Sequence, residues 1–403
     1  MSDAFLDPVS AESGVIEAKE VTSPAWMAVF SLTMGVFGLL TAEYLPASLL
    51  TPMAAGLGVS EALAGQAVTV TAVIAMFSGL LTASLTQKID RRVVLLAFSL
   101  LMIASNLLAA LSTSLTFLLA MRVLLGVALG GFWSMAAAVA MRLVPAALLP
   151  RALSIIFSGI SVATVVAVPF GSYLGGLYGW RSAFFAAAAL GAVTLLFQFL
   201  TLPPLAPQRP AKLSTILGIL RRPGIGVGML CCTFVHTGQY ALFTYIRPVL
   251  ESVMVINVSG LALVLLAFGI ANFVGTLVAG WVLERSLRAT LIVMPVLIGG
   301  ASLGLILLPT GTTGQVLLVI LWGMAFGGVP VAWSNWVAHA VPDQAESAGG
   351  MVVVSVQSAI ATGAAVGGVM FSIGGVIGVF SVASAILLLS ALLIALRVRV
   401  RPH

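Results

Sequence analysis

The chain has 403 residues, of which 61% are hydrophobic and only 7% are charged, with a formal net charge of +6. Soluble domains carry roughly 25% charged residues, so the composition excludes a water-soluble globular protein. The basic residues lie in separate short loops rather than in one patch, which indicates membrane topology and not a nucleic-acid partner. The only cysteines, Cys231 and Cys232, are adjacent in an apolar run, so they predict neither a disulfide framework nor a metal site.

Twelve apolar runs are long enough to cross a bilayer, which takes about 20 residues of helix. We therefore predict an all-α membrane protein. The predicted spans are 25–50, 62–86, 93–112, 117–141, 152–174, 182–202, 224–246, 259–283, 289–308, 315–340, 348–371 and 374–396.

The chain order predicts two helical bundles, 25–202 and 224–396, joined by a proline-rich polar linker at 203–223. All Lys and Arg residues except Arg122, Arg181 and Arg247 fall in the tails, the linker and the loops of one side. By the positive-inside rule that side is cytoplasmic, so we expect cytoplasmic tails at 1–24 and 397–403. The first tail is acidic, the wrong sign for a signal peptide.

The two bundles look like copies at a constant offset of 197 residues. The matched positions are Ala83 with Gly280, Arg91 with Arg288, Gly130 and Gly131 with Gly327 and Gly328, and Val144 and Pro145 with Val341 and Pro342. Such a repeat predicts halves related by an axis along the membrane normal, with the ligand site near the midplane between them.

Glu43 is the only acidic residue in any predicted span, and Pro46 follows three residues later. A carboxylate in hydrocarbon costs roughly 2.5 kcal/mol or more, so a functional or pairing role is expected. Proline removes a backbone donor and bends the helix near the carboxyl group. We interpret this segment as one wall of a transport cavity.

Arg122 is the only basic residue predicted to lie deep inside a span, and it shares a helix face with Gly126, Gly130 and Ser134. Counting 1.5 Å per residue from the outer ends of their spans puts Arg122 and Glu43 at similar depth. They could pair directly or through a polar bridge, and the pair could serve coupling or structure alone. Burial favours a neutral carboxyl group and a nearby arginine favours the charged form, so a pair whose separation changes would bind and release a proton.

The seventh span places His236, Gln239, Tyr240 and Phe243 within two helical turns. Their donors, acceptors and flat rings suit a planar heteroaromatic ligand that carries hydroxyl groups. For His236 a hydrogen bond inside the bundle is an equal alternative. Further candidate ligand residues are Trp133, Trp333, Asn335, Asn272 and Gln357, and for Asn272 and Gln357 a contact that joins helices is an alternative. We expect Tyr245, Arg247, Trp336 and His339 to lie at the membrane interface.

The loop after the second span resembles the Gly-x-x-x-Asp-Arg-x-Gly-Arg-Arg signature of the major facilitator superfamily. It contains Gln87, Asp90, Arg91 and Arg92, with Gln87 in place of the motif's acid, and the second copy contains Glu284, Arg285 and Arg288. The resemblance implies that these loops latch the halves at the cytoplasmic face. The alternative is a basic loop without a gating role.

The Arg122 segment and a Pro169-x-Gly171 run in the fifth span are similar to motifs of the twelve-span drug:proton antiporter branch. This resemblance implies the major facilitator fold, and proton coupling through Glu43 and Arg122. Longer runs resemble members that export purine ribonucleosides, namely 43–53, 64–72, 129–133, 243–248 and 343–346.

The resemblance implies a proton-coupled antiporter of the bacterial inner membrane that exports inosine, guanosine, adenosine and their analogues, and we expect a monomer without a cofactor. Sugar or multidrug efflux by the same fold is the alternative. A membrane-embedded enzyme would call for clustered acids or histidines within spans, and the chain has three histidines and one intramembrane acid. We therefore expect no enzymatic activity.

Overall fold

The computed structural model describes residues 24–207, 218, 221–254, 256–308, 311–341 and 345–398, without the side chains of 83, 84, 146, 150, 284, 338 and 345–350. Within these ranges every regular element is a helix. The predicted N-terminal tail up to residue 23, most of the linker and the end of the C-terminal tail lie outside the described residues.

The first half of the chain contains the elements that precede the linker. They are α1 (Trp26–Ser48), α2 (Leu50–Leu57), α3 (Glu61–Ala64), α4 (Gln66–Leu85), α5 (Arg91–Ala110), α6 (Leu115–Leu143), η1 (Ala146–Leu148), α7 (Leu149–Val162), the π-helical η2 (Ala163–Ala167), α8 (Val168–Tyr178) and α9 (Trp180–Thr201). α7, η2 and α8 run on without a break and correspond to the predicted fifth span.

The second half contains the elements that follow the linker. They are α11 (Ile225–Thr244), α12 (Ile246–Val253), α13 (Val258–Arg285), α14 (Leu287–Leu307), α15 (Gly311–Ala340) and α16 (Ala345–Arg397). Several helices begin at a polar residue whose side chain accepts a hydrogen bond from a backbone N–H of the first turn, as Asp90, Ser114 and Asn257 do.

Ten helical segments of the described residues are long and apolar enough to cross a membrane. One of them, Met351–Arg397, contains Gly375 at φ 57°, which breaks it into two crossings. α11 is a further helix of membrane length, with 20 residues, that is not among the ten because its sequence is more polar. The arrangement is consistent with the twelve predicted spans.

Close backbone contacts between helices occur at equivalent positions of the two halves, related by the offset of 197 residues. A side-chain carbon at Gly130 on α6 would collide with the carbonyl oxygen of Ala75 on α4. The equivalent carbon at Gly327 on α15 would collide with the carbonyl oxygen of Asn272 on α13. In each half, glycine therefore lets the two backbones pack in direct contact.

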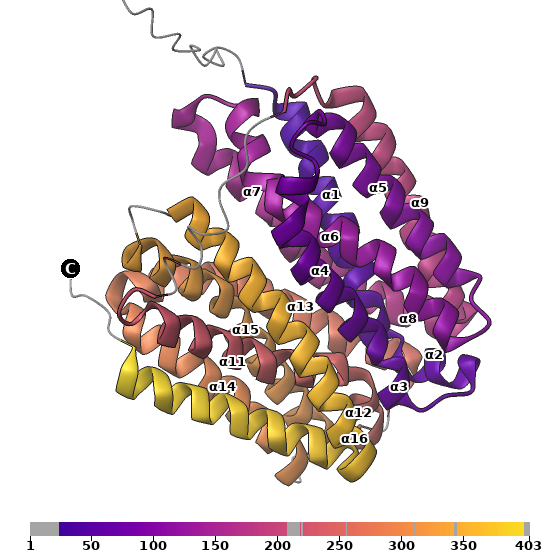
Figure 1. The fold of residues 1–403 in the computed structure, drawn as a ribbon. Coiled ribbons are helices and arrows are strands. Elements are labelled where there is room, and N and C mark those ends of the chain that lie inside the picture. Colours follow the sequence, from indigo (N-terminus) through magenta and orange to yellow (C-terminus); the bar gives the residue numbers. More distant parts are fainter. Residues whose placement is uncertain are drawn as a thin grey trace, which may run out of the picture.

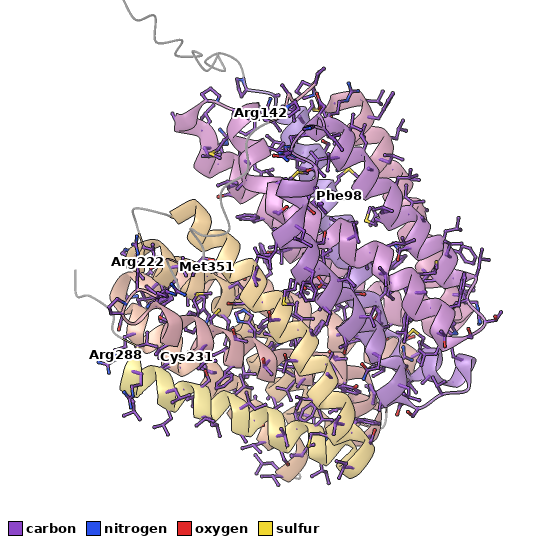
Figure 2. The ribbon with its side chains drawn as sticks, in the orientation of Figure 1. Phe98, Arg142, Arg222, Cys231, Arg288 and Met351 are labelled. Carbon is purple, nitrogen blue, oxygen red and sulfur yellow. The ribbon has the colours of Figure 1, made fainter. Side chains whose placement is uncertain are left out.

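The two halves lie side by side and diverge toward the end of the molecule at which α1 begins and α16 ends (Figure 1). We call this the linker end, and Figure 2 shows Arg142 there in the first half and Arg222 in the second. The opposite end, which carries α2, α3, α12 and Gly375, is called the distal end. Large apolar side chains such as Leu263 and Leu81 are exposed on the outer surface, where a membrane protein meets lipid.

Candidate functional site

Glu43 lies near the distal end of α1 and faces the other half of the molecule. Its side chain is buried, with 6% exposed, and lies beside the side chain of Gln357 on α16, which is also buried. Oε1 of Glu43 and Oε1 of Gln357 have no hydrogen-bond partner among the described residues. The carboxyl group therefore lies at the boundary between the halves and not against lipid.

Arg122 is fully buried on α6, and its guanidinium contacts α1 beside Glu43. Nη1 donates to the carbonyl oxygen of Ala42 at 3.0 Å, and Nη2 donates to Oδ1 of Asn106 at 3.3 Å. The guanidinium carbon lies 4.8 Å from the ring centre of Phe184. Arg122 and Glu43, both among the described residues, form no ion pair, so the direct pairing that the sequence left open is not formed, whereas their similar depth is confirmed.

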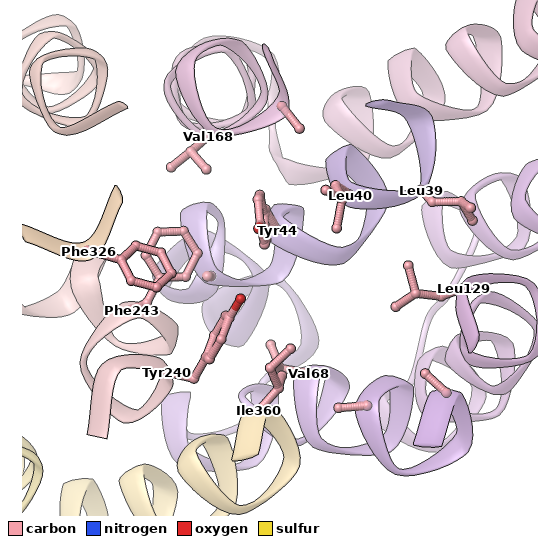
Figure 3. Packing of buried hydrophobic residues seen from close by; sticks show 14 of the residues in the cluster. Leu39, Leu40, Tyr44, Val68, Leu129, Val168, Tyr240, Phe243, Phe326 and Ile360 are labelled. Carbon is pink, nitrogen blue, oxygen red and sulfur yellow. The ribbon is translucent and has the colours of Figure 1, made fainter. Parts of the chain in front are cut away.

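Four aromatic side chains meet close to Glu43, and we call them the aromatic cluster: Tyr44 of the first half with Tyr240, Phe243 and Phe326 of the second (Figure 3). The ring centres of Tyr44 and Phe243 are 5.4 Å apart, and Tyr240 lies 6.3 Å from Phe243 and 6.1 Å from Phe326. The hydroxyl groups of Tyr44 and Tyr240 lie next to each other. The cluster therefore joins the halves with flat apolar faces and two hydroxyl groups.

Tyr240 stands at the position equivalent to Glu43 under the 197-residue offset. The site is therefore asymmetric, with a carboxyl group on the first half and a phenol on the second. The sequence patterns singled out Tyr240 and Phe243 but missed Tyr44 and Phe326. Their signals were present, because Tyr44 directly follows Glu43, and Phe326 lies one helical turn after Trp322 on the same face of α15.

His236 and Gln239 bind partners inside the second half. Nδ1 of His236 lies 2.8 Å from the carbonyl oxygen of Cys232, one turn earlier on α11, which agrees with the alternative of an internal hydrogen bond. Oε1 of Gln239 accepts a hydrogen bond from Nε1 of Trp322 at 2.7 Å. Since the indole can only donate, Trp322 orients the Gln239 amide so that its nitrogen is left without a partner.

The other candidate ligand residues lie in contacts between helices of one half. Nδ2 of Asn272 donates to the carbonyl oxygen of Gly323 on α15. The ring of Trp133 packs 5.9 Å from that of Phe157. The structure thus brings Gln357, Tyr240 and Phe243 to Glu43 but does not bring Asn272 or Trp133 there.

Trp333 and Trp336 are both buried and pack edge to face at 5.5 Å. The expectation of an interfacial Trp336 is wrong, because the absence of a side chain at Gly228 opens space on α11 that the indole fills. Asn335 is half-buried on the same helix, and its carbonyl oxygen lies 2.9 Å from Nδ1 of His339.

The two basic loops are held to their own halves. Asp90 caps α5 and accepts a hydrogen bond from the backbone N–H of Leu205, at the start of the linker. Asp90 therefore has a structural role where the family motif has glycine. Arg92 donates to the carbonyl oxygen of Phe199 at 2.7 Å, Arg288 to that of Ala395 at 2.7 Å.

Four further loop residues were predicted to have a gating role, and the structure describes the side chains of three of them. Nη1 of Arg91 donates to the hydroxyl oxygen of Thr86, and the guanidinium of Arg285 stacks 3.3 Å from the ring centre of Trp281. Gln87 is exposed. The side chain of Glu284 lies outside the described residues. A gating role for these loops stays a prediction.

Tyr245 and Arg247 are buried between the halves, so the expectation that they lie at the membrane interface is wrong. Tyr245 is fully buried and stacks on Phe371 with ring centres 5.2 Å apart. Arg247 is 5% exposed and donates to the carbonyl oxygen of Ser48, in the first half, at 2.8 Å. The position of Arg247 near the end of the predicted span suggested an anchor at the membrane surface. Its guanidinium instead forms its hydrogen bond with the other half of the protein.

Comparison with known proteins places this architecture in a family. A model of the Major Facilitator Superfamily matches residues 26–364. The purine ribonucleoside efflux pump NepI of Salmonella enteritidis PT4 is 44% identical over 385 residues, which cover 96% of this chain and 97% of that protein. NepI of Salmonella typhimurium matches with the same identity and coverage.

Solved structures share the fold at low sequence identity. A mutant form of the nucleoside transporter NupG superposes with a TM-score of 0.79 at 16% identity, covering 93% of this chain and 100% of that one. A D-xylose-proton symporter gives a TM-score of 0.75 at 17% identity, covering 93% and 98%. At these identities the likeness concerns the fold alone.

Proposed function

The chain belongs to the major facilitator superfamily, and from this membership and the geometry around Glu43 we propose that it is a proton-coupled antiporter that exports purine ribonucleosides from the cytoplasm. The linker end faces the cytoplasm of a bacterial cell, and the distal end faces the periplasm. The observation that carries the substrate is the 44% identity, over almost the whole length of both proteins, to pumps named for purine ribonucleoside efflux.

The aromatic cluster supports a purine as the ligand. Purine bases have two flat faces, and stacking on aromatic side chains contributes about 1–3 kcal/mol per base in proteins that bind nucleotides. Tyr44, Tyr240, Phe243 and Phe326 supply such faces from both halves. A ligand seated there contacts both halves, so its binding responds to their relative movement.

Polar groups next to the rings suit the ribose and the edge of the base. Oε1 of Gln357 is a buried acceptor without a partner, and the hydroxyl groups of Tyr44 and Tyr240 donate and accept. Leaving a buried polar atom unpaired costs free energy, and a ligand hydroxyl or amine that pairs with it gains correspondingly. We assign Gln357, Tyr240 and Phe243 to the substrate site, with Tyr44 and Phe326 added from the structure.

Glu43 is the residue that carries the proton. Burying a neutral carboxyl group in a low-dielectric interior costs far less free energy than burying a carboxylate. The protein therefore switches between its cytoplasm-open and periplasm-open states most readily when Glu43 is protonated or when substrate is bound. Arg122 acts indirectly, since it binds the carbonyl oxygen of the preceding residue, Ala42, and holds that part of α1 in place. Proton entry and nucleoside exit then use the same boundary between the halves.

Transport into inverted membrane vesicles tests the proposal. The cytoplasmic face of such vesicles is outside, so an acidic interior should drive labelled inosine inward, and a protonophore should abolish its accumulation. Labelled arabinose serves as the comparison substrate, and vesicles without the protein serve as the background. Accumulation of arabinose but not inosine would contradict the purine substrate and favour a sugar. Inosine accumulation that does not depend on the proton gradient would contradict the antiport mechanism.

A further inference from the structure

Arg247 reaches from the second half into the first at the distal end. It lies on α12, and its side chain is almost entirely buried. Nη1 donates to the carbonyl oxygen of Ser48 at 2.8 Å and lies 3.4 Å from Oγ of Ser172 on α8. A single guanidinium therefore joins α12 to two helices of the other half.

The carbonyl oxygen of Ser48 is well suited to a cation. Ser48 is the last residue of α1, and the last four carbonyl groups of a helix have no partner within the helix. The helix dipole also places partial negative charge at this end. Arg247 thus supplies a charged donor to an acceptor that would otherwise be buried and unpaired.

Glu251 adds a second connection between the halves. It lies one turn after Arg247 on α12, and its Oε1 is 2.8 Å from Nε of Arg247. Its Oε2 accepts a hydrogen bond from Oγ1 of Thr51 on α2, at 2.7 Å. The carboxylate therefore orients the guanidinium and is itself held by the first half.

The Arg247 connection is not repeated at the equivalent position of the first half. The position equivalent to Arg247 at the 197-residue offset is Leu50, so the repeat provides no matching cation in the first half. At the linker end, the hydrogen bonds of Arg92 and Arg288 hold each basic loop to its own half. The charged connection between halves described here thus lies at the distal end, while the linker ends diverge (Figure 1).

We propose that Arg247, oriented by Glu251, is a gating residue that holds the distal entrance closed, and that its release from Ser48 is a step in opening it. Alternating access requires the two halves to separate at the distal end. When they separate, Nη1 of Arg247 cannot stay bonded to the carbonyl oxygen of Ser48, so the two states differ by this contact. Removing it shifts the population toward the distally open state. The proposal does not depend on which substrate is carried.

Labelling of a cysteine beneath this contact tests the proposal without any substrate. Val168 lies on α8 one turn before Ser172, is 1% exposed, and points toward Tyr44 (Figure 3). A Val168→Cys variant, with Cys231 and Cys232 replaced by alanine, is treated from the distal side with a membrane-impermeant maleimide. Because the site is buried while the distal end is closed, the labelling rate reports the fraction of molecules that are distally open.

Replacing Arg247 by glutamine should raise this labelling rate roughly tenfold, as expected for loss of a charge-assisted hydrogen bond that exists in only one state. Thr51→Val removes the Glu251 connection at a partly exposed position and should raise the rate by a smaller factor, which gives a second reading if the arginine variant folds poorly.

Arg181→Gln is the matched control, because Arg181 also lies at the distal end but donates to Ser112 within its own half. Its labelling rate should equal that of the parent. Unchanged rates in both the Arg247 and Thr51 variants would overturn the proposal, and so would an equal rise in the Arg181 control.

Discussion

The guanidinium of Arg122 donates a hydrogen bond to the carbonyl oxygen of Ala42, the residue directly before Glu43 on α1. The Ala42 carbonyl oxygen faces α6 of the first half and the Glu43 side chain faces Gln357 of the second, so the arginine and the acid make different contacts on the same helix. In a direct ion pair, the residue that holds α1 in place would also control the charge of the acid. Here these two roles belong to different residues. Arg122 fixes the helix, and Glu43 has no cationic partner among the residues that the structure describes.

Replacing Arg122 by lysine should destabilise the protein by about 1–3 kcal/mol, because an ammonium group cannot reach both the Ala42 carbonyl oxygen and the Asn106 side chain. Thermal unfolding in detergent measures this change, and vesicle transport measures its effect on function. Arg142→Lys is the control, since that arginine donates to a linker carbonyl at the linker end. Equal unfolding temperatures for the two variants would argue against the positioning role of Arg122.

Replacing Gln357 by leucine should change how inosine binding depends on pH. The Gln357 amide lies beside the Glu43 carboxyl group, so its loss changes the surroundings in which that group binds and releases its proton, and the pH at which inosine dissociates should shift from that of the parent. Binding titrations across pH measure the shift. Gln315→Leu, whose amide donates to the Val253 carbonyl within the second half, should leave the profile unchanged.

Replacing Phe243 by alanine should weaken inosine binding about tenfold, because one stacking face for the base is lost. Equilibrium binding of labelled inosine gives the change in affinity. Phe157→Ala is the comparison, because Phe157 packs on Trp133 outside the aromatic cluster. If both variants lose affinity equally, the loss reflects packing and not stacking with the ligand.

Replacing Gly130 by alanine should destabilise the first half by about 1–3 kcal/mol or more, since the added carbon meets the Ala75 backbone, which cannot move aside as a flexible side chain can. Unfolding temperature in detergent is the measurement. Gly300→Ala should be neutral, because nothing lies within 4 Å of the added carbon. A neutral Gly130→Ala would contradict the direct backbone contact between α4 and α6.

The sequence alone was sufficient to predict the helical architecture. Apolar runs separated by polar turns define membrane spans, because backbone groups in lipid must be satisfied internally and runs of about 20 apolar residues do this as helices. The 197-residue offset also holds for the helices, as the counterparts of α6 and α15 demonstrate. The π-helical turn at η2 was not predicted, since its bonding pattern leaves no mark on hydrophobic periodicity.

The site was only partly predictable, because helical spacing places residues on a face without saying what that face contacts. Gln239 and Phe243 share one face of α11, yet Gln239 bonds Trp322 within the second half while Phe243 meets Tyr44 of the first. Arg247 was misread for the same reason. Its partners lie about 75 and 200 residues away along the chain, and no local pattern reports such contacts.

Protons released when inosine binds to the purified protein test the central claim most directly. In weakly buffered detergent solution, the parent protein should release protons into the medium on addition of inosine, because antiport makes the two ligands compete through Glu43. Glu43→Gln should bind without any release, and Glu61→Gln, which changes an acid at the distal end, should release protons as the parent does. Proton release that persists in Glu43→Gln would contradict the assignment of Glu43 as the proton carrier.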